Sequence, residues 1–198
     1  MFVVGLTGGV GSGKTEAARM LSEITVAKLF LADELGHQMM KQGTECFQRI
    51  VETFGGEIVA ESGEIDRGKL AECVFADTNL LEKLNGIIHP AVLGFLGEYC
   101  EEHRAEHGVL VIESAIMFEI GCDKLCDVVW YIRVPEELRV KRLQVSRGYS
   151  EEKCRAVIKK QMSEEEYCSR CDKVILNEGD FSLLWKRLAA EVEKFVEK

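Results

Sequence analysis

The chain has 198 residues, 46% of them hydrophobic, and a formal net charge of -9. This length allows one sizeable core but is short for two ordinary catalytic domains, and the acidic balance argues against nucleic acid as a partner. Because no apolar run approaches the roughly 20 residues that span a bilayer and the first residues lack a signal-peptide pattern, we expect a cytoplasmic protein with no membrane partner.

The first predicted element is a strand over residues 2–6, a short apolar run of the kind that is buried on both faces of a sheet. A glycine-rich segment follows, and residues 16–23 then have helical periodicity. Further buried strands are predicted at residues 109–112, 128–134 and 174–176, with a helix at 136–145. This alternation indicates an α/β fold with a parallel sheet.

Four more segments favour helix: residues 77–88, 92–107, 151–166 and the long amphipathic end, 181–196. Both prolines, Pro90 and Pro135, are expected to lie between elements, where proline is tolerated. The sequence contains no internal repeat or long linker, so we predict one domain.

The glycine-rich segment reads Gly8-Gly-Val-Gly-Ser-Gly-Lys-Thr15 and fits the phosphate-binding pattern G-x-x-x-x-G-K-[ST]. It lies between a predicted buried strand and a predicted helix, the context that the pattern requires. Its glycines let backbone N–H groups face phosphate oxygens, and the helix adds its positive end. The predicted ATP-binding residues here are Gly8, Gly9, Val10, Gly11, Ser12, Gly13, Lys14, Thr15 and Glu16.

Two side chains of this loop carry chemistry. Lys14 is a flexible charge that can reach the β- and γ-phosphates, and the Thr15 hydroxyl suits Mg²⁺, which prefers oxygen ligands. The alternative, a glycine-rich turn followed by a surface lysine, fits the strand and helix around it less well. The loop alone leaves the phosphoryl acceptor open, because such loops serve motors, switches and kinases.

The apolar run 29–32 ends in Asp33, and here the sequence resembles dephospho-coenzyme A (dephospho-CoA) kinases. In that family the second strand ends in D-A-D; this chain keeps the second acid as Asp33 and has Leu31 in place of the first. The resemblance implies that Asp33 is the general base for a ribose 3′-hydroxyl. Asp33 could instead bind Mg²⁺ or cap a helix.

The similarity continues through the middle of the chain, in Phe54-Gly, Asp66-Arg67 and His89-Pro90. In the family this region is a mobile helical subdomain that binds the acceptor, so the resemblance makes Arg67 and His89 candidate substrate-binding residues. The alternatives are a surface ion pair for Asp66 and Arg67, and a helix-capping turn at His89.

Further landmarks follow toward the C-terminus. Glu113 stands at the end of a predicted strand, where it could help hold Mg²⁺, although an exposed strand-end carboxylate is the simpler interpretation. Arg142 matches a lid arginine of the family that contacts ATP; Arg139 replaces its glutamine, and Arg147 falls one position later than the second lid arginine. The resemblance places the loop at Asn177 near the adenine.

Eight cysteines are present, and we interpret them as thiols of a reducing compartment. Two closely spaced pairs could in principle hold zinc. We favour small buried apolar residues instead, since these cysteines adjoin predicted strands. The pairs are Cys122 with Cys126, and Cys168 with Cys171.

The resulting prediction is a three-layer α/β P-loop kinase fold with a mostly parallel five-stranded sheet. Its core comprises residues 1–35, 108–139 and 166–198, with an acceptor-binding helical region at 36–107 and a lid at 140–165. The resemblance implies transfer of phosphate from ATP, with Mg²⁺, to dephospho-CoA, which is the last step of coenzyme A biosynthesis. The alternatives are another small-metabolite or nucleoside-monophosphate kinase, or a non-enzymatic ATP-binding switch.

Overall fold

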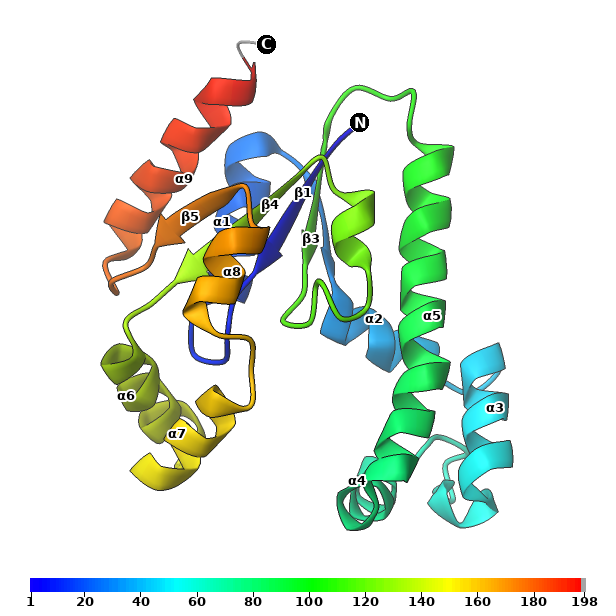
Figure 1. Ribbon diagram of the computed structural model, residues 1–198. Coiled ribbons are helices and arrows are strands. Elements are labelled where there is room, and N and C mark those ends of the chain that lie inside the picture. Colours follow the sequence, from blue (N-terminus) through cyan, green and yellow to red (C-terminus); the bar gives the residue numbers. More distant parts are fainter. Residues whose placement is uncertain (197–198) are drawn as a thin grey trace. The chain divides into compact units, whose positions relative to one another are not determined.

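The structure is a computed structural model that describes residues 1–196, and the chain divides into two compact units (Figure 1). Residues 1–31 and 103 onward form an α/β unit, and residues 32–102 form a helical unit.

The α/β unit is built on a five-stranded sheet with the strand order β2-β3-β1-β4-β5. Each of the four neighbouring pairs is parallel, so the carboxyl ends of the strands share one edge. Apolar residues dominate because both faces of a parallel sheet are covered. The strands are β1 (Phe2–Thr7), β2 (Lys28–Leu31), β3 (Val109–Glu113), β4 (Val128–Arg133) and β5 (Lys173–Leu176).

Helices α1 (Lys14–Thr25) and α9 (Phe181–Val196) pack against each other and against the sheet. The core between them includes Leu6 from β1, Leu21 from α1 and Leu188 from α9, each fully buried. The predicted range of the terminal helix matches α9. The α/β unit also contains the short η2 (Cys122–Leu125) and helices α6 (Glu136–Arg147), α7 (Glu151–Lys159) and α8 (Glu164–Arg170).

The prediction of one helix over residues 151–166 is wrong, because the chain forms α7 and α8 with a break between them. Ser163 begins α8 as a capping box: its side chain accepts a hydrogen bond from the Glu166 amide, and the Glu166 carboxylate accepts one from the Ser163 amide. This S-x-x-E pattern is a helix-start signal in the sequence. The break leaves Gln161 in a turn.

The helical unit has its own apolar core, formed by residues such as Ile50, Ile58 and Leu70. A separate core lets this segment pack as a unit although it is inserted between two strands of the sheet. Its elements are α2 (Ala32–Met39), α3 (Glu45–Phe54), η1 (Gly56–Ile58), α4 (Arg67–Ala76) and α5 (Thr78–Glu102).

Pro90 lies inside α5, so the prediction of two helices with Pro90 between them is wrong. A proline within a helix costs about 3 kcal/mol, through a lost hydrogen bond and a clash with the preceding turn. Ile87, Val92 and Leu96 of the same helix are buried on both sides of the proline. Their burial explains why α5 continues, since each buried apolar side chain contributes about 1.5 to 3 kcal/mol.

All eight cysteines are free thiols, and no cluster of three or more His, Cys, Asp or Glu side chains that could hold a metal ion occurs among the described residues. Within residues 1–196, none of the helices has the length and apolar character needed to cross a membrane.

We predict that Leu188→Ala lowers the free energy of unfolding by about 2 to 5 kcal/mol, because truncating a fully buried leucine leaves a cavity in the core. Leu183→Ala on the same helix is the matched control, since Leu183 is 38% exposed. Urea unfolding of both variants checks the prediction, and equal losses would contradict the assignment of this core.

Candidate active site

The glycine-rich loop connects β1 to α1 in a backbone shape that depends on glycine. Gly11 and Gly13 have φ angles of 77° and 76°, in the left-handed region that other residues seldom adopt. A Cβ at Gly13 would also lie 2.7 Å from Asn177 Nδ2. Helix α1 begins at Lys14 without a side-chain cap, so the N–H groups of its first turn can serve a phosphate group.

Arg139 and Gln161 hold one side of this loop. Arg139 Nε donates to the Val10 carbonyl at 2.9 Å, and Gln161 Oε1 accepts from both the Val10 amide and Arg139 Nη2, each at 2.8 Å. We name Val10, Arg139 and Gln161 the loop latch. Burial lowers the pKa of Arg139, but a guanidinium stays protonated in proteins. The latch therefore engages both polar groups of Val10: the charged Arg139 donates to its carbonyl, and the Gln161 side-chain oxygen accepts from its amide.

Arg142 and Asn177 hold the other side of the loop. Arg142 Nη1 donates to the carbonyls of Gly11 and Ser12 at 3.1 and 3.3 Å, and Asn177 Nδ2 donates to the Ser12 carbonyl at 2.8 Å. Because C=O and the next N–H of a trans peptide point in opposite directions, holding the Ser12 carbonyl turns the Gly13 N–H to the opposite side. Arg142 and Asn177 thus fix the orientation of the Gly13 amide.

Lys14, Thr15 and Glu113 come together beside the loop. Parallel pairing sets Glu113 of β3 opposite Leu6 of β1, at the strand edge where the loop starts. Lys14 Nζ lies 3.8 Å from Glu113 Oε1, and the Thr15 hydroxyl donates to Glu113 Oε2 at 3.1 Å. Glu113 is only 4% exposed, so the strand-end carboxylate is buried next to a cation and a hydroxyl.

Two hydroxyl groups at the loop are buried without a hydrogen-bond partner among the described residues: Thr7 Oγ1, at the end of β1, and Ser12 Oγ. A buried polar atom without a partner costs free energy. Such a cost at a loop of this pattern is consistent with groups that serve a bound polar ligand.

Other predicted ATP-binding residues lie at the rim of the α/β unit. Glu16, in the first turn of α1, is 3.9 Å from Arg19. Arg147 ends α6, and its guanidinium lies 5.9 Å from the ring centre of Tyr149. Within residues 1–196, Arg147 therefore contacts this ring and not the glycine-rich loop.

The predicted acceptor residues lie in the helical unit. Asp33 is exposed in the first turn of α2, and Arg67 is the first residue of α4, which Asp66 caps by accepting from the amides of Gly68 and Lys69. His89 lies within α5 rather than in the capping turn considered from the sequence. Their contacts with a substrate stay predictions.

Arg139 and Gln161 are site residues whose contacts with the loop the sequence reasoning missed. In the sequence, Arg139 stands out only as a departure from the family's glutamine, and no motif considered above includes Gln161. A usable signal was present, because the capping box at Ser163 predicts that Gln161 lies in a turn. That Arg139 faces Gly9 was not readable: a Cβ on Gly9 would meet Arg139 Nη2 at 2.2 Å.

Comparison with known proteins finds a family match over most of the chain. The sequence profile of the dephospho-CoA kinase family matches residues 2–182. A dephospho-CoA kinase of Carboxydothermus hydrogenoformans is 34% identical over 195 residues, which cover 98% of this chain and 94% of that protein.

The chain belongs to the dephospho-CoA kinase family. The predicted enzyme class, an ATP-using kinase with dephospho-CoA kinase activity in the last step of coenzyme A biosynthesis, is thereby confirmed.

Solved structures confirm the fold class. A crystal structure from Thermus thermophilus superposes with a TM-score of 0.77 at 30% identity, covering 98% of this chain and 97% of that one. The dephospho-CoA kinase from Campylobacter jejuni gives a TM-score of 0.75 at 21% identity, with the same coverage of 98% and 97%. The predicted five-stranded sheet is parallel throughout.

The loop latch generates a prediction for this kinase. Arg139→Ala should raise the KM for ATP about tenfold or more, since a hydrogen bond from a charged group contributes about 1.5 to 3 kcal/mol. Arg155→Ala is the matched control, because Arg155 is exposed and pairs with Glu136, Glu137 and Glu151 instead of the loop. Initial rates at varied ATP concentration measure both.

A Cβ at position 9 would displace the Arg139 guanidinium. Gly9→Ala should therefore raise the KM for ATP by about as much as Arg139→Ala does. The double variant should then be little worse than either single variant, since both remove the same contact. Additive losses, or an equal loss in Arg155→Ala, would show that the latch does not position the loop.

Proposed function

We propose that this chain transfers the γ-phosphoryl group of ATP to the ribose 3′-hydroxyl of dephospho-CoA, giving ADP and coenzyme A. The observation that carries the proposal is the glycine loop between a buried strand and an uncapped helix, with Lys14 and Glu113 beside it, in a chain of this family. The loop amides and the start of α1 would hold the triphosphate.

Lys14 and Arg142 are the cations we assign to the transferring phosphate. Lys14 has a flexible stem that can move its charge from Glu113 to the β- and γ-phosphates. Arg142 lies with one guanidinium nitrogen on the loop carbonyls and the other 3.4 Å from Asn177 Oδ1, and burial lowers its pKa. Positive charge held in a partly dry site stabilises the charge that develops during transfer.

Asp33 is the residue we assign to the acceptor hydroxyl. In the step, a bond forms between the ribose 3′-oxygen and the γ-phosphorus while the bond from that phosphorus to the β,γ-bridging oxygen breaks. The electron pair of the broken bond stays on ADP, and the 3′-hydroxyl proton passes to the Asp33 carboxylate. A carboxylate can orient the hydroxyl and take the proton late in a loose transition state.

Thr15 and Glu113 are the residues we propose for Mg²⁺. Their oxygen atoms lie 3.1 Å apart, and a hydroxyl and a carboxylate are the hard oxygen donors that this ion prefers. When bound, the ion supplies positive charge that offsets the charge of the β- and γ-phosphates.

Arg67 and His89 are the proposed contacts for the coenzyme A portion. We also propose that residues 36–107 bind the acceptor and that residues 140–165 form a lid. Arg67, at the start of α4, carries a planar guanidinium suited to phosphate oxygens. The cytoplasmic location expected from the sequence also remains a prediction.

We predict that Lys14→Ala lowers kcat by about 100-fold or more, because the charge on the transferring phosphoryl group would be poorly neutralised. Lys28→Ala, which removes the same charge from an exposed position at the start of β2, should keep wild-type turnover. ADP release in a coupled assay measures both, and a Lys14→Ala variant with full activity would remove the loop from the mechanism.

Asp33→Asn should bind both substrates and turn over about 100-fold more slowly or worse, the usual loss when a general base is removed. The neighbouring exposed carboxylate provides the control, Glu34→Gln. If Asp33→Asn retained wild-type turnover, another group would have to accept the proton.

The identity of the acceptor is tested by ADP release with dephospho-CoA, nucleoside monophosphates and shikimate. Release that depends on dephospho-CoA supports the proposal. Release with another acceptor, or none at all, would favour the alternative kinases or the switch considered from the sequence.

A further inference from the structure

A small cavity of about 250 Å³ in the helical unit has a distinct chemical lining. It lies between the end of α2 and the start of α4, and its walls combine three nitrogen-bearing side chains, one carboxylate and two apolar side chains. The lining residues are His37, Met40, Lys41, Glu64, Ile65 and Arg67.

The charged groups of Lys41 and Arg67 make no ion pair or hydrogen bond within the described part of the chain. Over residues 1–196 the structure records no ion pair and no side-chain hydrogen bond for Lys41 or Arg67, whereas Glu64 accepts a hydrogen bond from the Gln42 amide at 3.3 Å. With His37 neutral, the formal charge of the lining is two cations minus one anion, or +1. Unpaired positive side chains around one cavity, in a chain with a net charge of -9, favour an anionic ligand.

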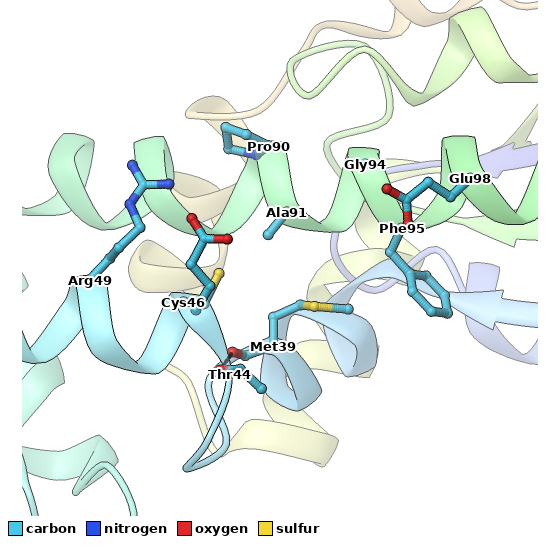
Figure 2. A pocket seen from close by; sticks show the side chains of 10 residues that line it. Met39, Thr44, Cys46, Arg49, Pro90, Ala91, Gly94, Phe95 and Glu98 are labelled. Carbon is cyan, nitrogen blue, oxygen red and sulfur yellow. Dashed lines mark hydrogen bonds between the residues drawn. The ribbon is translucent and has the colours of Figure 1, made fainter.

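A larger cavity of the same unit, about 430 Å³, differs in charge. Figure 2 shows Arg49 on α3 and Glu98 on α5 at its opposite ends, and Glu45 adds a second carboxylate, so its formal charge is one cation minus two anions, or -1. A multiply charged anion is therefore favoured in the smaller cavity and disfavoured in this one.

The smaller cavity and Asp33, the residue proposed for the acceptor hydroxyl, share helix α2. His37 follows Asp33 by four residues, so the two lie on one face of the helix about 6 Å apart along its axis. In dephospho-CoA the 3′-hydroxyl and the 5′-diphosphate extend from opposite sides of one ribose ring. A ribose held at Asp33 with its 5′ side toward His37 would place its diphosphate along α2, on the side of Lys41.

We infer that the cavity between α2 and α4 binds the diphosphate group of the acceptor, with Lys41 and Arg67 as its charged contacts. Arg67 can pair its planar donors with two phosphate oxygens, and Lys41 adds a point charge. The apolar walls from Met40 and Ile65 reduce competition from water. The inference rests on the proposed function, because it takes the acceptor to be dephospho-CoA.

Lys41→Ala tests this site through kinetics. The KM for dephospho-CoA should rise about tenfold, the effect of losing a charge-assisted hydrogen bond, while kcat and the KM for ATP stay within about twofold, since the contact is the same in ground and transition states. Lys41→Arg should restore most of the affinity. The control is Arg49→Ala, which removes a cation from the other cavity of the unit.

A second test compares the binding of two ligands, dephospho-CoA and adenosine. Calorimetric binding of dephospho-CoA should weaken about tenfold in Lys41→Ala, whereas adenosine, which has the ribose and no phosphate, should bind both proteins equally. A tenfold loss for both ligands, an equal loss in Arg49→Ala, or no loss would overturn the inference.

The two proposals fail in different ways. If the wild-type protein releases no ADP with dephospho-CoA, the proposed function fails. If it does release ADP but Lys41→Ala binds dephospho-CoA as the wild type does, the diphosphate site alone fails.

Discussion

The site depends on one constraint, which is that side chains from distant elements hold the glycine-rich backbone between β1 and α1 in one shape. Glycine makes the left-handed turns at positions 11 and 13 accessible. Side chains from α6 and the residue after β5 then donate to the loop carbonyls, and Gln161 in the α7–α8 turn accepts from the Val10 amide. These contacts restrict the loop to one shape, and a preorganised loop loses less binding free energy to ordering than a loose one.

The two compact units divide the chemistry between them. The α/β unit carries the loop, the cations and the buried carboxylate Glu113, which the sheet register places opposite Leu6. The helical unit carries Asp33 and a cavity lined by unpaired cations, and it has a core of its own. In the proposed function, the α/β unit holds the nucleotide and the helical unit holds the acceptor.

Local signals in the sequence predict the structure correctly where one interaction dominates. The apolar runs gave the strands, and the amphipathic pattern of residues 181–196 gave α9. They failed where a local rule was outweighed: Pro90 breaks helices by rule, yet burial of Ile87, Val92 and Leu96 keeps α5 continuous. The capping box at Ser163 is a local signal for the start of α8, and it separates α8 from α7.

The sequence by itself determined the loop, the α/β class and the family, because each depends on residues that are neighbours in the chain. Only the tertiary structure decided that Arg139 and Gln161 grip Val10 over separations of 129 and 151 residues, that Glu113 meets Lys14 and Thr15, and that Lys41 and Arg67 line one cavity. Such contacts depend on how helices and strands pack, and no periodicity along the chain records which side chains packing brings together.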